Sequence, residues 1–267
     1  MFTLNIPVTS GNIAAIKAEL TRTLPDVKSS HRCEAAARGL GYKTYASILA
    51  ASRSADVVIA TARGAAFSAY LADHGFDVPP LLLYRAAARV AIRAVLDHNP
   101  KLSMHGIGAG RPRLTENNRR ETPQEHYAKF LESREELLGD HALEEFLRAL
   151  AFLGLVPPTK TVRPGTDSYR LKHIAENYRC TYPEGEELGP DYVSNGALIA
   201  AAIHAGFRYR TYMDDLGYDS LNVDFNMSKA VLDDLDCKIR PNGARAQTRR
   251  TRGLMRNPGP LRHAVPI

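Results

Sequence analysis

The last thirty residues limit the fold most strongly, because they cannot supply a hydrophobic core. Residues 238–267 contain eight Lys or Arg and no Asp or Glu, and Asp236 is the last acidic residue. The whole chain has a formal net charge of +6, whereas residues 1–237 hold 27 basic and 29 acidic side chains. A strongly charged segment without apolar periodicity buries too little surface to fold alone. We therefore expect a compact, faintly acidic body and a basic tail that is disordered when free.

The body has the composition of a mainly helical protein. Hydrophobic residues make up 44% of the chain, Ala-rich segments dominate, Trp is absent and β-branched runs are short. A length of 267 residues allows one large domain or two small ones. We predict a mainly α (α+β) fold that comprises an N-terminal helical domain (1–100), a basic linker with Gly and Pro (101–121), a helical domain with a β-hairpin (122–236) and the basic tail (237–267).

Local signals place the starts and ends of several helices. Thr122-Pro123-Gln124-Glu125 has the form of a capping box with Pro at the first helical position. Asn12 is expected to cap a helix that runs to residue 24, and Ser194 one that ends at Gly206. A Gly followed by an aromatic residue predicts a Schellman ending at three places, Gly41-Tyr42, Gly75-Phe76 and Gly206-Phe207.

Neither cysteine spacing nor hydropathy points to secretion or to a membrane. The three cysteines, Cys33, Cys180 and Cys237, are far apart and odd in number, which argues against a disulfide framework. Residues 2–20 lack the basic and apolar regions of a secretory signal. Arginines interrupt the longest apolar run, 81–96, so we do not expect it to span a bilayer. These features predict a reduced protein of the cytoplasm with no membrane partner.

The tail is the first candidate binding segment. Its arginines stand among Gly, Pro and Asn without acidic neighbours, a pattern that binds polyanions by releasing counterions. RNA, DNA or an acidic protein surface would each suit it, and a solvated tail without a partner is the alternative. The predicted contact residues are Arg240, Arg245, Arg249, Arg250 and Arg252.

A predicted strand near the C-terminus combines basic and aromatic side chains. Strands are expected at 207–213 and 221–227, joined as an antiparallel hairpin. Alternation in the first strand places Arg208, Arg210 and Tyr212 on one face. This face could bind phosphate and stack a base, or it could be the solvated side of a half-buried hairpin.

A third candidate surface comes from two successive helix starts. A helix expected from Ser168 carries Tyr169, Lys172 and His173 along one face. The next helix start, residues 192–196, contributes Asn195. Together these side chains would form one polar recognition surface, and the alternative is a pair of capped helix starts with no partner.

No motif gives a convincing catalytic or metal-binding signature. His-x-x-Glu occurs three times, but its order is the reverse of the di-iron motif, and Glu in a first helical turn is explained by the helix dipole. A triad of Ser194, His173 and Asp191 lacks the Gly-x-Ser-x-Gly elbow. The run from Gly106 to Arg111 lacks the Gly-Lys-Ser/Thr of a phosphate-binding loop. We therefore expect no catalysis, cofactor or metal.

Two parts of the sequence resemble known groups of proteins. Residues 30–45, SHRCEAAARGLGYKTY, resemble a small helical module described as glyoxalase-related, which carries that name without the metal ligands of a glyoxalase. Residues 146–176 and 192–207 resemble uncharacterised accessory proteins that phages and plasmids of proteobacteria encode. These resemblances imply a mobile genetic element, a bacterial host cytoplasm and an accessory role.

Charge and resemblance together give the functional hypotheses. The first is a non-catalytic binding protein of a mobile genetic element that inhibits a host defence ribonucleoprotein, in the manner of an anti-CRISPR protein, by steering both a basic and an acidic surface to it. The alternative is a DNA- or RNA-binding regulator of plasmid or phage replication or transfer. A nuclease would need a carboxylate or His cluster that the sequence does not assemble.

Overall fold

The computed structural model describes residues 2–256 and confirms a mainly α fold with small antiparallel sheets. The described residues form eleven helices and four two-stranded sheets. The first part of the chain contains β1 (Asn5–Pro7), α1 (Ser10–Thr23), α2 (Ser29–Gly39), α3 (Tyr45–Ala51), β2 (Ile59–Thr61), α4 (Gly64–Ala72) and α5 (Leu81–His98). The middle contains β3 (Leu102–Ser103), β4 (Gly106–Ile107), α6 (Pro123–Glu136) and α7 (Asp140–Leu153). The last part contains α8 (Ser168–Ala175), β5 (Cys180–Thr181), β6 (Glu187–Gly189), α9 (Asn195–His204), β7 (Tyr209–Arg210), β8 (Asp224–Phe225), α10 (Lys229–Ile239) and α11 (Ala244–Arg256).

Three helices form the centre of a single hydrophobic core. α7 and α9 pack against each other, and both contact α5. Ala86, Ala87 and Ala88 of α5 are completely buried, and their small side chains let neighbouring helices approach closely. The core extends from Phe2 to Leu232. It therefore continues through the predicted boundary between the domains, because α5, the last helix of the predicted first domain, packs on helices of the second.

The predicted linker, 101–121, is part of the packed body. It contains β3 and β4, which form their own short hairpin. A Cβ on Gly106 would lie 2.0 Å from the Leu221 carbonyl oxygen, so only glycine fits this close approach. Glu121, at the end of the segment, is buried and is tied to α6 through Lys129 (2.6 Å) and His126 (3.0 Å). These contacts are why the segment is not a free connection between two domains.

Most of the predicted helix boundaries are confirmed. Thr122 and Glu125 form the expected capping box. Gly41, Gly75 and Gly206 have positive φ angles (+85°, +82° and +85°), and the next aromatic residue donates its N–H to a carbonyl five residues back, as a Schellman ending requires. The prediction for Asn12 is wrong. Thr9 caps α1 instead, because the helix begins at Ser10.

The C-terminal hairpin is confirmed in a shorter form. β7 and β8 pair antiparallel, with Tyr209 opposite Phe225 and Arg210 opposite Asp224. Phe207, just before β7, is buried, whereas Arg208 and Arg210 are exposed, so the expected alternation holds. The residues beyond these two pairs form turns and irregular backbone instead of longer strands.

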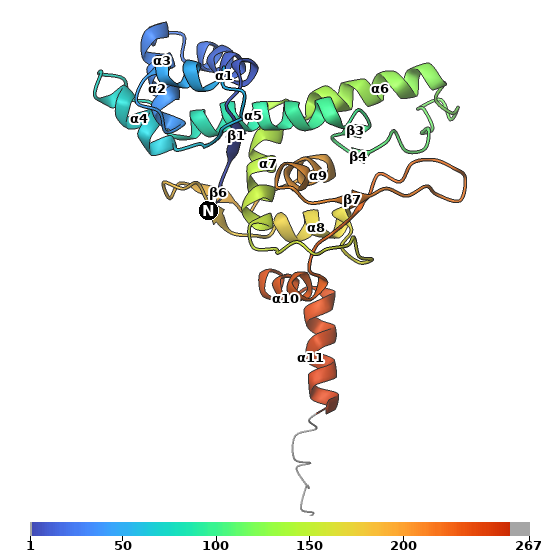
Figure 1. Cartoon of the computed structure of the whole chain (residues 1–267). Helices are drawn as coiled ribbons and strands as arrows, with labels where there is room; N and C mark the ends of the chain where they lie inside the picture. The colour runs from blue at the N-terminus through green and yellow to red at the C-terminus, as the bar shows by residue number, and fades with distance from the viewer. Residues whose placement is uncertain (1, 257–267) are drawn as a thin grey trace, which may run out of the picture.

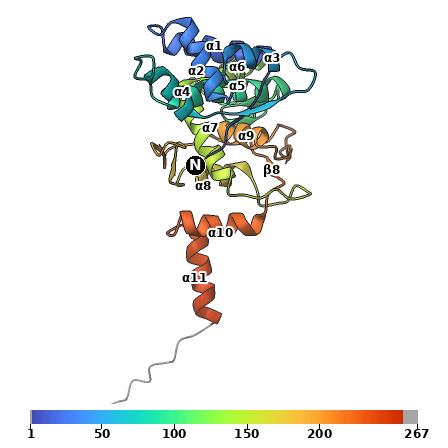
Figure 2. The ribbon, with the colours of Figure 1, turned by 60° about the vertical axis from the view of Figure 1, so that its left-hand side comes forward.

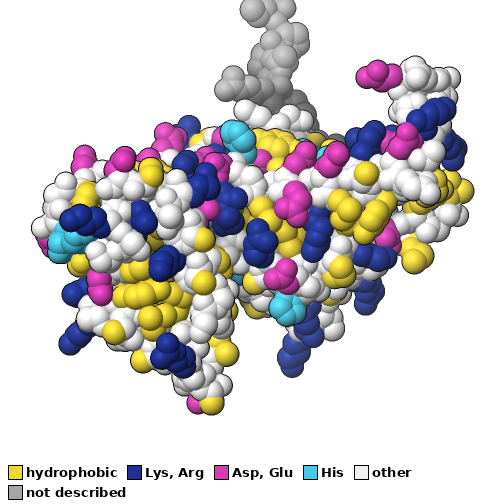
Figure 3. Space-filling view, turned by 90° about the horizontal axis from the view of Figure 1, so that it is seen from above, with side chains coloured by type: hydrophobic (Ala, Val, Ile, Leu, Met, Phe, Trp, Pro, Cys, Tyr) yellow, Lys and Arg dark blue, Asp and Glu magenta, His cyan; other side chains and the backbone are white. Residues whose placement is uncertain are grey.

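The outline of the molecule separates the body from its last two helices. Figure 1 shows α1–α5 at one end, α7 running away from them towards α8 and α9, and α10 and α11 beyond α8. Figure 2, turned by 60°, again shows α11 projecting beyond α10, at the end of the molecule away from α1–α5. Seen from the α1–α5 end in Figure 3, basic and acidic side chains are intermixed, with several hydrophobic groups between them. Among residues 2–256, no helix has the length and apolarity needed to cross a bilayer.

Candidate polyanion-binding site

The basic tail is helical where the structure describes it, so the prediction of disorder is wrong for residues 237–256. α10 continues to Ile239, a four-residue turn follows, and α11 begins at Ala244. Ala246 is 5% exposed, which places one face of α11 against the chain. The remaining predicted tail residues, 257–267, lie outside the described residues. We call α10, α11 and Arg170 of α8 together the arginine module.

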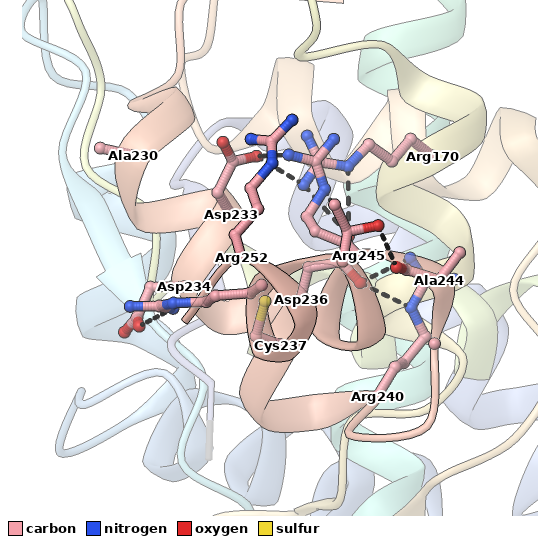
Figure 4. A pocket seen from close by; sticks show the side chains of 13 residues that line it. Arg170, Ala230, Asp233, Asp234, Asp236, Cys237, Arg240, Ala244, Arg245 and Arg252 are labelled. Carbon is pink, nitrogen blue, oxygen red and sulfur yellow. Dashed lines mark hydrogen bonds and ion pairs between the residues drawn. The ribbon is translucent and has the colours of Figure 1, made fainter. Parts of the chain in front are cut away.

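An acidic face on α10 holds the arginine module together. Asp236, whose side chain is 5% exposed, accepts from Arg240 at 2.6 Å and from Arg170 at 3.1 Å. Arg170 also contacts Asp233 at 2.8 Å, so one guanidinium from α8 binds two carboxylates of α10. Figure 4 shows these side chains converging. A nearly buried carboxylate needs several such partners, because its desolvation is costly.

Two tail arginines bind the outer aspartates. Arg245 reaches Asp233 at 2.7 Å, and Arg249 reaches Asp234 at 3.1 Å. Hydrogen bonds from Lys238 and Arg249 lower the pKa of Asp234. Burial acts to raise the pKa of Asp233, but hydrogen bonds from Lys229 and Arg170 outweigh it, and the pKa stays below its ordinary value. Both carboxylates are therefore ionised at neutral pH and neutralise part of the tail.

The outer surface of α11 remains strongly basic. Within residues 2–256, ion pairs join Arg240, Arg245 and Arg249 to aspartates, but none involves Arg250 or Arg252. Both of these side chains are exposed. Residues 229–256 hold eight basic and three acidic side chains, so a positive excess survives the internal pairing. Arg252 also lines an open hollow of about 1310 Å³ between the helices, which Figure 4 shows.

The predicted surface on α8 forms in part. Lys172 is 7% exposed, and its Nζ lies 5.4 Å from the ring centre of Tyr169 and 5.0 Å from that of Tyr192. His173 packs edge-on against Tyr169, with ring centres 4.6 Å apart. Lys172 and His173 both bind Glu176, at 2.9 and 2.7 Å. The structure thus brings together residues from both predicted helix starts.

Asn195 does not join this surface. It is 7% exposed, and its amide nitrogen donates to the carbonyl oxygens of His105 and Leu221, both at 3.0 Å. These bonds fasten the turn between β3 and β4, and the segment before β8, to the first turn of α9. Asn195 is therefore a structural residue of the body.

The predicted basic strand stands apart from the arginine module. Arg208 donates to the carbonyl oxygen of Lys160, and neither Arg208 nor Arg210 lines the hollow of the module. The Tyr212 hydroxyl donates to Asp224 at 2.6 Å, which partly occupies the polar end of this residue. The strand supplies exposed positive charge without a shared site.

Sequence reasoning missed four residues of the module: Arg170, Asp233, Asp234 and Asp236. The signal was present in the spacing. Asp233 and Asp236 lie three residues apart and so share a helical face. They precede arginines at 245, 249 and 252, which also share one face of a helix. The average charge of the tail does not reveal that its arginines match the aspartates that precede them.

The three side chains of the triad considered from the sequence, Ser194, His173 and Asp191, each have another partner. Ser194 caps α9 by accepting from the Ala197 N–H, and Asp191 pairs with Arg148 at 2.8 Å. His173 binds Glu176 at 2.7 Å. In the described part of the chain, no group of three or more His, Cys, Asp or Glu side chains could hold a metal ion.

Comparisons with known proteins give no relative from which to read a function. No family model matches the chain, and neither a curated protein nor a solved structure matches it significantly.

Proposed function

We propose that the chain is a non-catalytic nucleic-acid-binding protein, and that it acts as a regulator of replication or transfer for a phage or plasmid. The observation that carries this proposal is a pair of exposed arginines, Arg250 and Arg252, on a helix that projects from the body. Neither forms an ion pair within the part of the chain that the structure describes. Guanidinium groups bind phosphates well, because their planar donors match phosphate oxygens. The mobile-element context comes from the sequence resemblance alone.

The ion pairs of the module suggest how binding proceeds. Arg250 and Arg252 meet the polyanion first, because no carboxylate among residues 2–256 forms an ion pair with either of them. Backbone phosphates then compete with Asp233 and Asp234 for Arg245 and Arg249, whose side chains are 42% and 67% exposed. Exposed ion pairs contribute little free energy each, so this exchange costs little. Asp236 keeps Arg170 and Arg240 and holds α10 on the body throughout.

The proposal predicts a strong dependence of binding on salt. Full-length protein should shift a labelled oligonucleotide in a gel, with affinity falling steeply as salt rises. Each lost phosphate contact reduces the slope of log K against log salt by roughly 0.7 to 0.9. The double variant Arg250→Ala/Arg252→Ala should therefore flatten that slope by roughly 1.4 to 1.8 and weaken binding at low salt.

A matched control separates a local contact from a change in net charge. Lys43→Ala/Arg53→Ala removes the same charge from exposed positions that flank α3, at the opposite end of the molecule. This control should keep the salt slope of the wild type. Equal losses in the two double variants, or a wild type that shifts no nucleic acid, would contradict the proposal.

A second candidate function is inhibition of a host defence ribonucleoprotein, in the manner of an anti-CRISPR protein. Exposed apolar side chains on α6 favour a protein partner: Tyr127 is 60% and Leu131 is 43% exposed. Such an inhibitor should co-purify with the host complex and restore plaque formation in hosts with intact defences. Tyr127→Ala/Leu131→Ala should abolish both effects while gel shifts stay unchanged.

A further inference from the structure

Two exposed tyrosines form an aromatic surface on the body. Tyr169, at the start of α8, is 52% exposed, and Tyr192, in the loop before α9, is 57% exposed. Both rings lie against the same Lys172 ammonium, at 5.4 and 5.0 Å. Their centres are therefore at most about 10 Å apart, and cation–π attraction holds them in place.

The charges beneath the rings are internally matched. Lys172 is almost buried and binds Glu176, which also accepts from His173. Asp191, the neighbour of Tyr192, is paired with Arg148. The groups open to a ligand are therefore the two aromatic rings and the Asp191 side chain, which is 63% exposed but paired with Arg148.

This aromatic surface adjoins the arginine module through the chain itself. Tyr169 directly precedes Arg170, whose guanidinium binds Asp233 and Asp236 of α10. Successive residues on a helix point about 100° apart, so α8 presents an aromatic ring on one side and joins the basic module on the next. A single strand could therefore contact both surfaces.

We propose that the nucleic acid bound by this chain is single-stranded, with bases stacked on Tyr169 and Tyr192 while α11 binds the backbone phosphates. This inference rests on the proposed function. Proteins that bind single strands combine a basic surface with aromatic side chains, and stacking tolerates any sequence because every base has a π face. Paired bases inside a duplex offer no free face to either ring.

The test compares three labelled ligands of equal length at one salt concentration: oligothymidylate, an abasic phosphodiester oligomer and a duplex. Wild-type protein should bind oligothymidylate most tightly. Removal of each ring by Tyr169→Leu or Tyr192→Leu should weaken that binding by about fivefold or more. Binding to the abasic oligomer should not change, because its phosphates contact α11. Tyr→Phe variants, which keep the rings, should bind like the wild type.

A control variant and a fluorescence measurement separate this inference from the function on which it rests. Tyr127→Leu, at an exposed tyrosine of α6, should bind like the wild type. The chain has no Trp, so quenching of tyrosine emission by thymine bases can be followed directly and should decrease in Tyr169→Leu. If the leucine variants bind all three ligands equally less well, or none less well, the aromatic surface is not a stacking site, although the proposed function stands. If wild-type protein binds no ligand, both proposals are overturned.

Discussion

α9 and α11 are helices of similar length that are stabilised in opposite ways. All of residues 195–202 in α9 are buried, so this helix is held by removal of apolar surface from water. Within residues 244–252 of α11, only Ala246 is buried, and the helix is held mainly by ion pairs from Arg245 and Arg249 to α10. Moderate salt does not weaken apolar burial, whereas it screens exposed ion pairs. The body should therefore be a stable platform and α11 an attachment that opens readily.

The largest effect should come from a cavity in the body. Phe146 of α7 is completely buried, and its ring lies 5.6 Å from that of His204 on α9. Phe146→Ala should lower the free energy of unfolding by about 3–5 kcal/mol, because the cavity adds to the lost apolar burial. Urea denaturation followed by circular dichroism measures this change. Leu155→Ala, at a side chain that is 42% exposed, should change stability by only about 0.5 kcal/mol.

A smaller and local effect should follow from weakening the acidic face of α10. Asp236→Asn keeps the shape of the side chain but removes the charge that binds Arg170 and Arg240. The same carboxylate also lies 3.6 Å from Arg245 of α11, so its loss reaches that helix directly. We expect α11 to lose about 1–3 kcal/mol of local stability, less than for full removal of a buried partner. Trypsin should then cut after Arg245 and Arg249 faster than in the wild type. Hydrogen exchange in α9 should stay the same.

Asp234, a more exposed aspartate on the same helix, provides the control. The Asp234 side chain is 43% exposed, against 5% for Asp236. Asp234→Asn should leave the trypsin rate near that of the wild type, because an exposed pair is screened and contributes little. If the two variants are cut equally fast, the burial of Asp236 does not explain how α11 is attached.

The difference between the body and α11 also shows what the sequence can predict. The capping box at Thr122 and the three Gly-aromatic helix ends were readable because both depend on neighbouring residues. The burial of Asn195 was not, since its amide bonds to His105 and Leu221, which are distant in sequence. The fold of the tail was missed for a related reason: its stability comes from aspartates that lie before it, and average composition does not record such pairing.

The smallest effect should appear on acidification. The pKa values of Asp233 and Asp234 lie below the ordinary 3.8. Burial opposes this for the pKa of Asp233, whereas Lys229, Arg170 and Lys238 supply most of the lowering. Arg245 and Arg249 supply the part of the pKa lowering that depends on attachment of α11. A lowered pKa stabilises the attached state at pH above that ordinary value, and the stabilisation is lost as pH falls through the lowered values. An NMR titration from neutral pH downwards should therefore show α11 amide signals shifting below about pH 4.5, while α9 signals remain in place.

A variant with uncharged side chains at both aspartate positions sharpens this last comparison between α9 and α11. In Asp233→Asn/Asp234→Asn, neither side chain can take up a proton. The acid transition of α11 should therefore become smaller, and the α11 signals at neutral pH should already lie closer to those of the acid form. Asp236 still holds Arg170 and Arg240, so α10 should stay on the body in this variant. A transition that persists unchanged, or that α9 and α11 undergo together in the wild type, would mean that the two helices are not held by different forces.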